Sequence, residues 1–155
     1  MVRRLTLVVL SLALVGATTA EAVRLSPGDV LVASDDQVHH YSASGADLGV
    51  FASDLSNASW ITTDRRANIY VTEYTGNRIR KFSPNGNTLL TISTAYTPGG
   101  VAIAADGGIY VAHYDTGKIH RYSPAGADLG IFASYAGCDA GCGTDFIIES
   151  CINKA

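Results

Sequence analysis

Residues 61–86 read ITTDRRANIYVTEYTGNRIRKFSPNG, and residues 101–126 read VAIAADGGIYVAHYDTGKIHRYSPAG. Both stretches contain an Ile-Tyr-Val run, a glycine and a Ser-Pro pair, and they are offset by forty residues. An earlier copy is also visible, because 38–53 (VHHYSASGADLGVFAS) resembles 119–134 (IHRYSPAGADLGIFAS) at an offset of eighty-one residues. A fixed internal period is typical of repeat architectures. The chain therefore contains three copies of one unit.

Each copy has the composition of short β-strands separated by turns. Runs rich in Val, Ile, Tyr and Thr alternate with Gly, Pro, Asn and Asp. The predicted strands are 60–63, 69–73, 78–82 and 88–93 in the middle copy, 100–104, 109–113, 118–122 and 128–133 in the last copy, and about 30–33, 38–42 and 47–52 in the first copy. We call the four strands of a unit A to D. The first copy lacks strand A.

Four antiparallel strands in about forty residues are typical of a β-propeller blade. Ile79 and Phe82 point to opposite faces of one predicted strand, yet both are large and apolar. A blade that is covered on both faces by its neighbours predicts this pattern. The sequence therefore predicts an all-β fold, a partial β-propeller of about three four-stranded antiparallel blades at about 28–53, 60–94 and 100–134. An open β-solenoid is the alternative.

Two motifs carry a family resemblance. Residues 71–86 (VTEYTGNRIRKFSPNG) and 100–111 (GVAIAADGGIYV) resemble the NHL-repeat propellers and the related gluconolactonase-like propellers. The likeness covers about residues 28–134 and implies a propeller that usually closes with six blades. Such families include interaction modules, lactonases and lyases. Residues 72–79 also resemble a segment of virginiamycin B lyase-like propellers, which eliminate across a lactone ester bond.

The first 22 residues are typical of a secretory signal peptide. Arg3 and Arg4 precede a mostly apolar run at 5–15, and an Ala-x-Ala cleavage site follows at 20–22. A run of about eleven residues is too short for a membrane-spanning helix, which needs about twenty. We therefore expect a secreted or periplasmic chain that begins at residue 23 and has no membrane span after cleavage. An uncleaved N-terminal membrane helix is the alternative.

The expected mature chain has 133 residues and a net charge of −4. Because it has no basic cluster that could neutralise phosphates, nucleic acid is not an expected partner. A propeller uses about four to eight blades, and four blades of this length need about 160 residues. We therefore expect that the chain cannot close a ring alone.

The two ends of the repeat region are complementary. The first copy lacks strand A, and residues 144–149 (TDFIIE) resemble a strand A with no strands B to D after it. Two chains could therefore form six complete blades as a head-to-tail homodimer. The alternative is that the chain is a fragment or a truncated relative of a longer propeller.

Three cysteines, Cys138, Cys142 and Cys151, lie in the tail at 135–155. In an oxidising compartment they suggest one disulfide, with one thiol left over. Both Cys138–Cys142 and Cys142–Cys151 remain open as pairings.

Candidate functional residues lie at the end of strand B and in the loop to strand C. Glu73 and His113 occupy matching positions in neighbouring copies, and Asp115 follows His113 closely. A carboxylate and an imidazole on neighbouring blades could hold a divalent metal or act as acid and base. The alternative is that each is a solvated or hydrogen-bonded loop residue.

Three histidines, His39, His40 and His120, lie on strand C, where other copies carry Arg or Lys. This interchange predicts a polar strand surface. We expect a non-catalytic extracytoplasmic binding or scaffold module that takes a protein or small-molecule ligand at the propeller loops. The alternative is a small-molecule lyase or hydrolase with a metal held by loop histidine and carboxylate residues.

Overall fold

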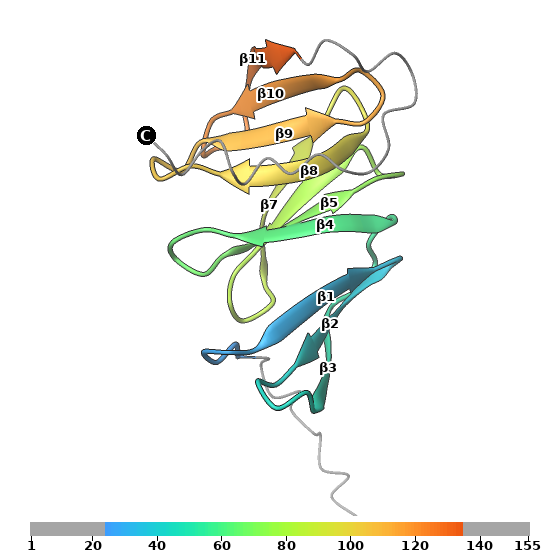
Figure 1. The fold of residues 1–155 in the computed structure, drawn as a ribbon, viewed down its shortest axis with the longest axis vertical. Coiled ribbons are helices and arrows are strands. Elements are labelled where there is room, and N and C mark those ends of the chain that lie inside the picture. Colours follow the sequence, from blue (N-terminus) through green and yellow to red (C-terminus); the bar gives the residue numbers. More distant parts are fainter. Residues whose placement is uncertain (1–23, 135–155) are drawn as a thin grey trace, which may run out of the picture.

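The computed structural model describes residues 24–134, which form eleven β-strands and no helix (Figure 1). The strands are β1 (Val30–Ser34), β2 (Gln37–Tyr41), β3 (Asp47–Ala52), β4 (Ala58–Thr63), β5 (Ile69–Glu73), β6 (Arg78–Phe82), β7 (Thr88–Ser93), β8 (Pro98–Ile103), β9 (Ile109–His113), β10 (Lys118–Tyr122) and β11 (Asp128–Ser134). The predicted signal peptide, the three cysteines and the segment 144–149 lie outside the described residues. The described residues contain no helix that is long and apolar enough to span a membrane.

The strands form three antiparallel sheets, each of which follows the chain order. We call β1-β2-β3 blade 1, β4-β5-β6-β7 blade 2 and β8-β9-β10-β11 blade 3. This arrangement confirms the predicted all-β fold, and within residues 24–134 blade 1 contains no strand A. Strands β4 and β8 begin two residues earlier than predicted, because pairing continues past a register shift to Ala58↔Glu73 and Pro98↔His113.

The blades stack face to face, with blade 2 in the middle (Figure 1). We call the face of a blade that points to the preceding blade its rear face, and the opposite face its forward face. Phe82 is buried against blade 1 and Ile79 against blade 3, so both faces of blade 2 are covered as predicted. Each fully buried aliphatic or aromatic side chain contributes about 1.5–3 kcal/mol. The stability of the stack therefore comes mainly from its two interfaces between blades.

The connectors between blades are hydrogen-bonded to the turns that join strands B and C. In the first connector, Ala58 N donates to Asp35 O at 2.6 Å, and Asn57 O accepts from Tyr74 N at 2.8 Å. The second connector is also bonded to both turns, from Thr94 N to Asn77 O at 2.8 Å and from Tyr114 N to Thr97 O at 2.9 Å. Each connector is thus held between two successive blades, which fixes the side chains at the end of strand B.

Candidate functional site

Glu73 ends β5, and its side chain is 0% exposed. Its Oε2 accepts hydrogen bonds from Ser56 N and Arg78 Nη2, both at 2.7 Å, and its Oε1 accepts one from Arg80 Nε. Burial acts to raise the pKa of Glu73, but the hydrogen bonds from Arg78 and Ser56 and the charge of Arg80 outweigh burial and lower the pKa. The carboxylate is therefore ionised and fully occupied by donors of this chain.

His113 takes the same place at the end of β9 and is 1% exposed. Its Nδ1 lies 3.2 Å from Tyr96 O, in the second connector. A carbonyl oxygen only accepts, so Nδ1 carries the proton and Nε2 keeps a free lone pair. Nε2 is buried and has no partner among the described residues. Burial, and then the nearby His120, lower the pKa of His113, which is neutral at neutral pH.

His120 completes a small aromatic cluster on the rear face of blade 3. Its ring centroid lies 4.9 Å from that of His113, and the Tyr96 ring packs edge-on against both. Its Nδ1 lies 3.1 Å from the carboxylate of Asp128, which fixes the orientation of the ring. Its Nε2, like that of His113, is buried without a partner among the described residues. Neither imidazole therefore presents Nε2 to solvent.

The predicted polar surface of strand C is wrong for His40 and His120, which are both buried. Each is the buried member of a contact with an aspartate, His40 with Asp29 and His120 with Asp128. Lys81 and Arg121 take the place of His40 in the other blades and also contact an aspartate, so this position carries a basic group beside a carboxylate in all three blades. Exposure to solvent is not required for that interchange.

A carboxylate in the turn before strand B contacts a base on strand C in every blade. The pairs and their N–O distances are Asp29–His40 at 2.7 Å, Asp64–Lys81 at 3.5 Å and Asp106–Arg121 at 3.1 Å. The aspartate lies one, five and three residues before the strand, respectively. Because the spacing changes, an alignment of the repeats does not reveal this contact.

Asp115, the third predicted site residue, lies in the turn after β9. Its carboxylate accepts long hydrogen bonds from Thr97, at 3.4 Å from the backbone nitrogen and 3.5 Å from the hydroxyl. No hydrogen bond or ion pair joins Glu73, His113 and Asp115 to one another in the described part of the chain. Nor do residues 24–134 contain a group of three or more His, Cys, Asp or Glu residues placed to hold a metal ion. The geometry favours roles for these residues in holding the connectors.

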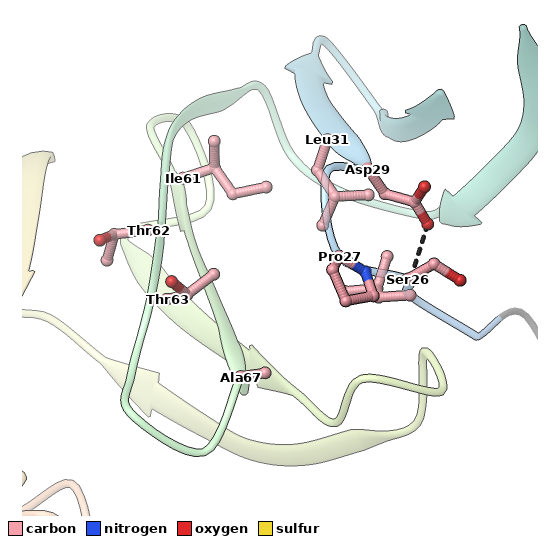
Figure 2. Close-up of a pocket in the computed structure, with 9 residues that line it drawn as sticks. Ser26, Pro27, Asp29, Leu31, Ile61, Thr62, Thr63 and Ala67 are labelled. Carbon is pink, nitrogen blue, oxygen red and sulfur yellow. Dashed lines mark hydrogen bonds between the residues drawn. The ribbon is translucent and has the colours of Figure 1, made fainter. Parts of the chain in front are cut away.

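An open groove lies between blade 1 and blade 2 (Figure 2). Its volume is about 570 Å³, and it is lined by Leu25, Ser26, Pro27, Asp29, Leu31, Ile61, Thr62, Thr63 and Ala67. In Figure 2, residues of β1 and the segment before it face residues of β4 and the turn after it. The segment before β1 is shaped by a hydrogen bond of 2.7 Å from Ser26 N to Asp29 Oδ2.

The groove lies beside β1, where the described part of the chain supplies no strand A for blade 1. Strand β1 lies beside β4 as β5 lies beside β8, so β1 holds the place of a strand B. In blade 2 the strand B is paired on both sides, by β4 and β6, whereas β1 is paired only by β2 within the described residues. The opposite edge of β1, next to a partly apolar groove, therefore has no pairing strand among residues 24–134. The sequence predicted the missing strand but not the groove.

The chain resembles solved β-propeller structures. A streptogramin B lyase aligns with a TM-score of 0.56 and 18% identity, over 68% of this chain and 37% of the lyase. Virginiamycin B lyase from Staphylococcus aureus aligns with a TM-score of 0.51 and 18% identity, over 63% and 38%. Regucalcin, a calcium-binding protein from Agrobacterium tumefaciens, aligns with a TM-score of 0.53 and 17% identity, over 72% and 44%.

These likenesses establish a β-propeller fold. The chain spans about two fifths of the length of the structures that it matches. No protein-family model and no curated protein sequence matches it.

Proposed function

We propose that the chain is a binding or scaffold module built from propeller blades, which takes an extended peptide strand along the free edge of β1. The finer assignment of the blades to the NHL-repeat or gluconolactonase-like type is part of this proposal. It is supported by the motifs at 71–86 and 100–111.

The observation that carries the proposal is the unpaired edge of β1 beside the groove. An exposed strand edge pairs readily with another strand, because each new backbone hydrogen bond satisfies a donor and an acceptor. Peptide binding by strand addition gains affinity from the main chain and specificity from pockets for alternate side chains. Leu31 and Ile61 provide apolar contacts of this kind on either side of the groove.

A peptide with the sequence of β4, ASWITT, is a direct probe, since β4 fills the equivalent place in blade 2. We expect saturable binding of the labelled peptide, measured by fluorescence anisotropy at low protein concentration. The same peptide with Ile61→Pro should bind more weakly by a factor of about ten or more, because proline removes a ladder donor.

A matched pair of protein variants locates the binding site. Thr63→Trp places a large side chain in the groove from an exposed position and should weaken binding of the peptide. Thr88→Trp changes an exposed residue of β7, away from the groove, and should leave binding unchanged. Equal affinity in both variants would show that the peptide binds elsewhere, and no binding to the parent chain would refute the proposal.

We also propose that the module acts outside the cytoplasm, with one disulfide among Cys138, Cys142 and Cys151. The support is the signal-peptide pattern of residues 1–22. N-terminal sequencing of the exported chain should begin at Val23. Thiol titration of the denatured, unreduced chain should find one free thiol for each chain.

A further inference from the structure

The rear face of blade 1 exposes apolar residues whose equivalents are buried in the other blades. Val30 is 52% exposed and Val32 is 44% exposed, although both belong to a strand B. Their counterparts in blade 2, Ile69 and Val71, are 0% exposed because blade 1 covers them. The same holds for Ile109 and Val111 in blade 3. Within the described residues, blade 1 thus has the rear face of an internal blade but no blade behind it.

The forward face of blade 3 is also uncovered by the described residues. Phe132 is 59% exposed and packs edge-on against Tyr110, with ring centroids 4.8 Å apart. The counterpart of Tyr110 in blade 2 is Tyr70, which is buried against blade 3. Among the described residues, the stack therefore has an uncovered rear face on blade 1 and an uncovered forward face on blade 3. These are the two kinds of face that pack against each other between neighbouring blades.

The turns between strands C and D give independent support. A Cβ atom on Gly126 would lie 2.9 Å from Ile92, in strand D of the preceding blade. A Cβ on Gly86 would likewise lie 3.1 Å from Phe51 O, in the preceding blade. Gly45 has the same place in blade 1, but a Cβ there would meet no atom of the described residues within 4 Å. The described residues therefore leave open, beside the turn of blade 1, the space that a preceding blade fills beside the other two turns.

From these features we infer that a second copy of this chain covers both ends of the stack head to tail, so that two chains form one ring of six blades. The inference rests on the proposed function, because residues 144–149 of the partner would be the strand that pairs with β1. In the sequence nine residues lie between β11 and this segment, whereas connectors of four or five residues separate the described blades.

A second copy is the favoured occupant because it supplies both matching faces and the missing strand without any other component. A head-to-tail interface closes into a ring when its rotation completes a full turn. The aligned part covers about two fifths of the solved propellers, so two copies would supply about four fifths of a ring of that size.

Sedimentation velocity of the mature full chain tests the inference across about 1 to 200 µM, because association depends on concentration. We expect the mass to rise from one chain to two, with no larger species. Val32→Lys should abolish the dimer by placing a charge on the covered rear face. Leu89→Lys is the matched control, since Leu89 is 53% exposed on a strand D of the middle blade. That control should leave the dimer intact.

Two further variants keep the test decisive. Phe132→Lys changes the opposite face and should also give a monomer, and circular dichroism shows whether either lysine variant has lost its fold. A mixture of the two lysine variants should regain part of the dimer, because each mixed pair keeps one intact head-to-tail interface. Ile147→Pro should weaken the dimer if 144–149 pairs with β1.

A monomer at every concentration, or an open series of larger species, would overturn the inference. So would a dimer that survives Val32→Lys in a folded protein. A monomer that still binds the ASWITT peptide would overturn the homodimer while leaving the strand-binding function standing. A monomer that does not bind the peptide would overturn both.

Discussion

At the scale of single residues, the last position of strand B shows how one backbone site can carry different chemistry. Blade 2 places Glu73 there and surrounds it with two arginines, whereas blade 3 places His113 there beside another imidazole. In both blades the side chain bonds to the backbone of the connector from the preceding blade. The position therefore joins successive blades, and in blade 2 the charge of Glu73 is balanced by the two arginines.

Glu73→Gln should destabilise the protein by about 3 kcal/mol, because it leaves Arg78 and Arg80 without their buried carboxylate. Urea denaturation followed by the fluorescence of Trp60, the single tryptophan, measures the change. Asp106→Asn is the control, since its ion pair with Arg121 is exposed and should contribute about 1 kcal/mol or less. Equal effects of the two substitutions would contradict a central role for Glu73.

The buried His113 predicts a loss of stability in mild acid. Its pKa is lowered in the folded state, so the unfolded chain binds a proton at pH values where the folded chain does not. The free energy of unfolding should therefore fall as the pH drops through about 6.5 and level off below the folded pKa.

His113→Phe keeps a flat ring but cannot titrate, so its stability should change less between neutral and mildly acidic pH than that of the parent chain. Urea denaturation at a series of pH values gives the difference between the two proteins, which isolates this one group. If the free energy of unfolding changed equally with pH in the two proteins, His113 would not be the source of the pH dependence.

At the scale of strands and turns, the sequence was informative where its pattern is local. Valine, isoleucine and tyrosine runs between turn residues predicted the strands of all three blades, and the two apolar faces at Ile79 and Phe82 predicted stacking. The buried roles of His40 and His120 were not predictable, because their partners lie in turns and strands of variable spacing. The groove was also not predictable from the sequence, because it is formed by the packing of β1 and its preceding segment against β4.

The turns between strands C and D allow a matched substitution. Gly45 and Gly126 have similar φ angles, +83° and +89°, and each donates a 2.9 Å hydrogen bond to the serine three residues earlier. Gly45→Ala should cost about 1 kcal/mol for the left-handed backbone alone. Gly126→Ala adds a clash with Ile92 and should cost about 3 kcal/mol.

Denaturation at low protein concentration, where the chain is expected to be monomeric, measures both changes. Equal costs in the monomer would contradict the close contact between blades 2 and 3. A cost for Gly45→Ala that grows with protein concentration would instead indicate that another copy has come to lie against blade 1.

At the scale of the whole molecule, stability should vary along the stack, because each blade contacts only its neighbours. Blade 2 is covered on both faces, and β5 is buried along its whole length. Amide hydrogen exchange, followed by mass spectrometry at low concentration, should therefore be slowest in β5 and fastest in β3 and β11. Uniform exchange across the three blades would mean that they unfold as one unit.

At high concentration a closed ring has no end blade, so the protection of β1 against exchange should rise toward that of β5. A chain that remains monomeric should instead keep the gradient of protection that it has at low concentration.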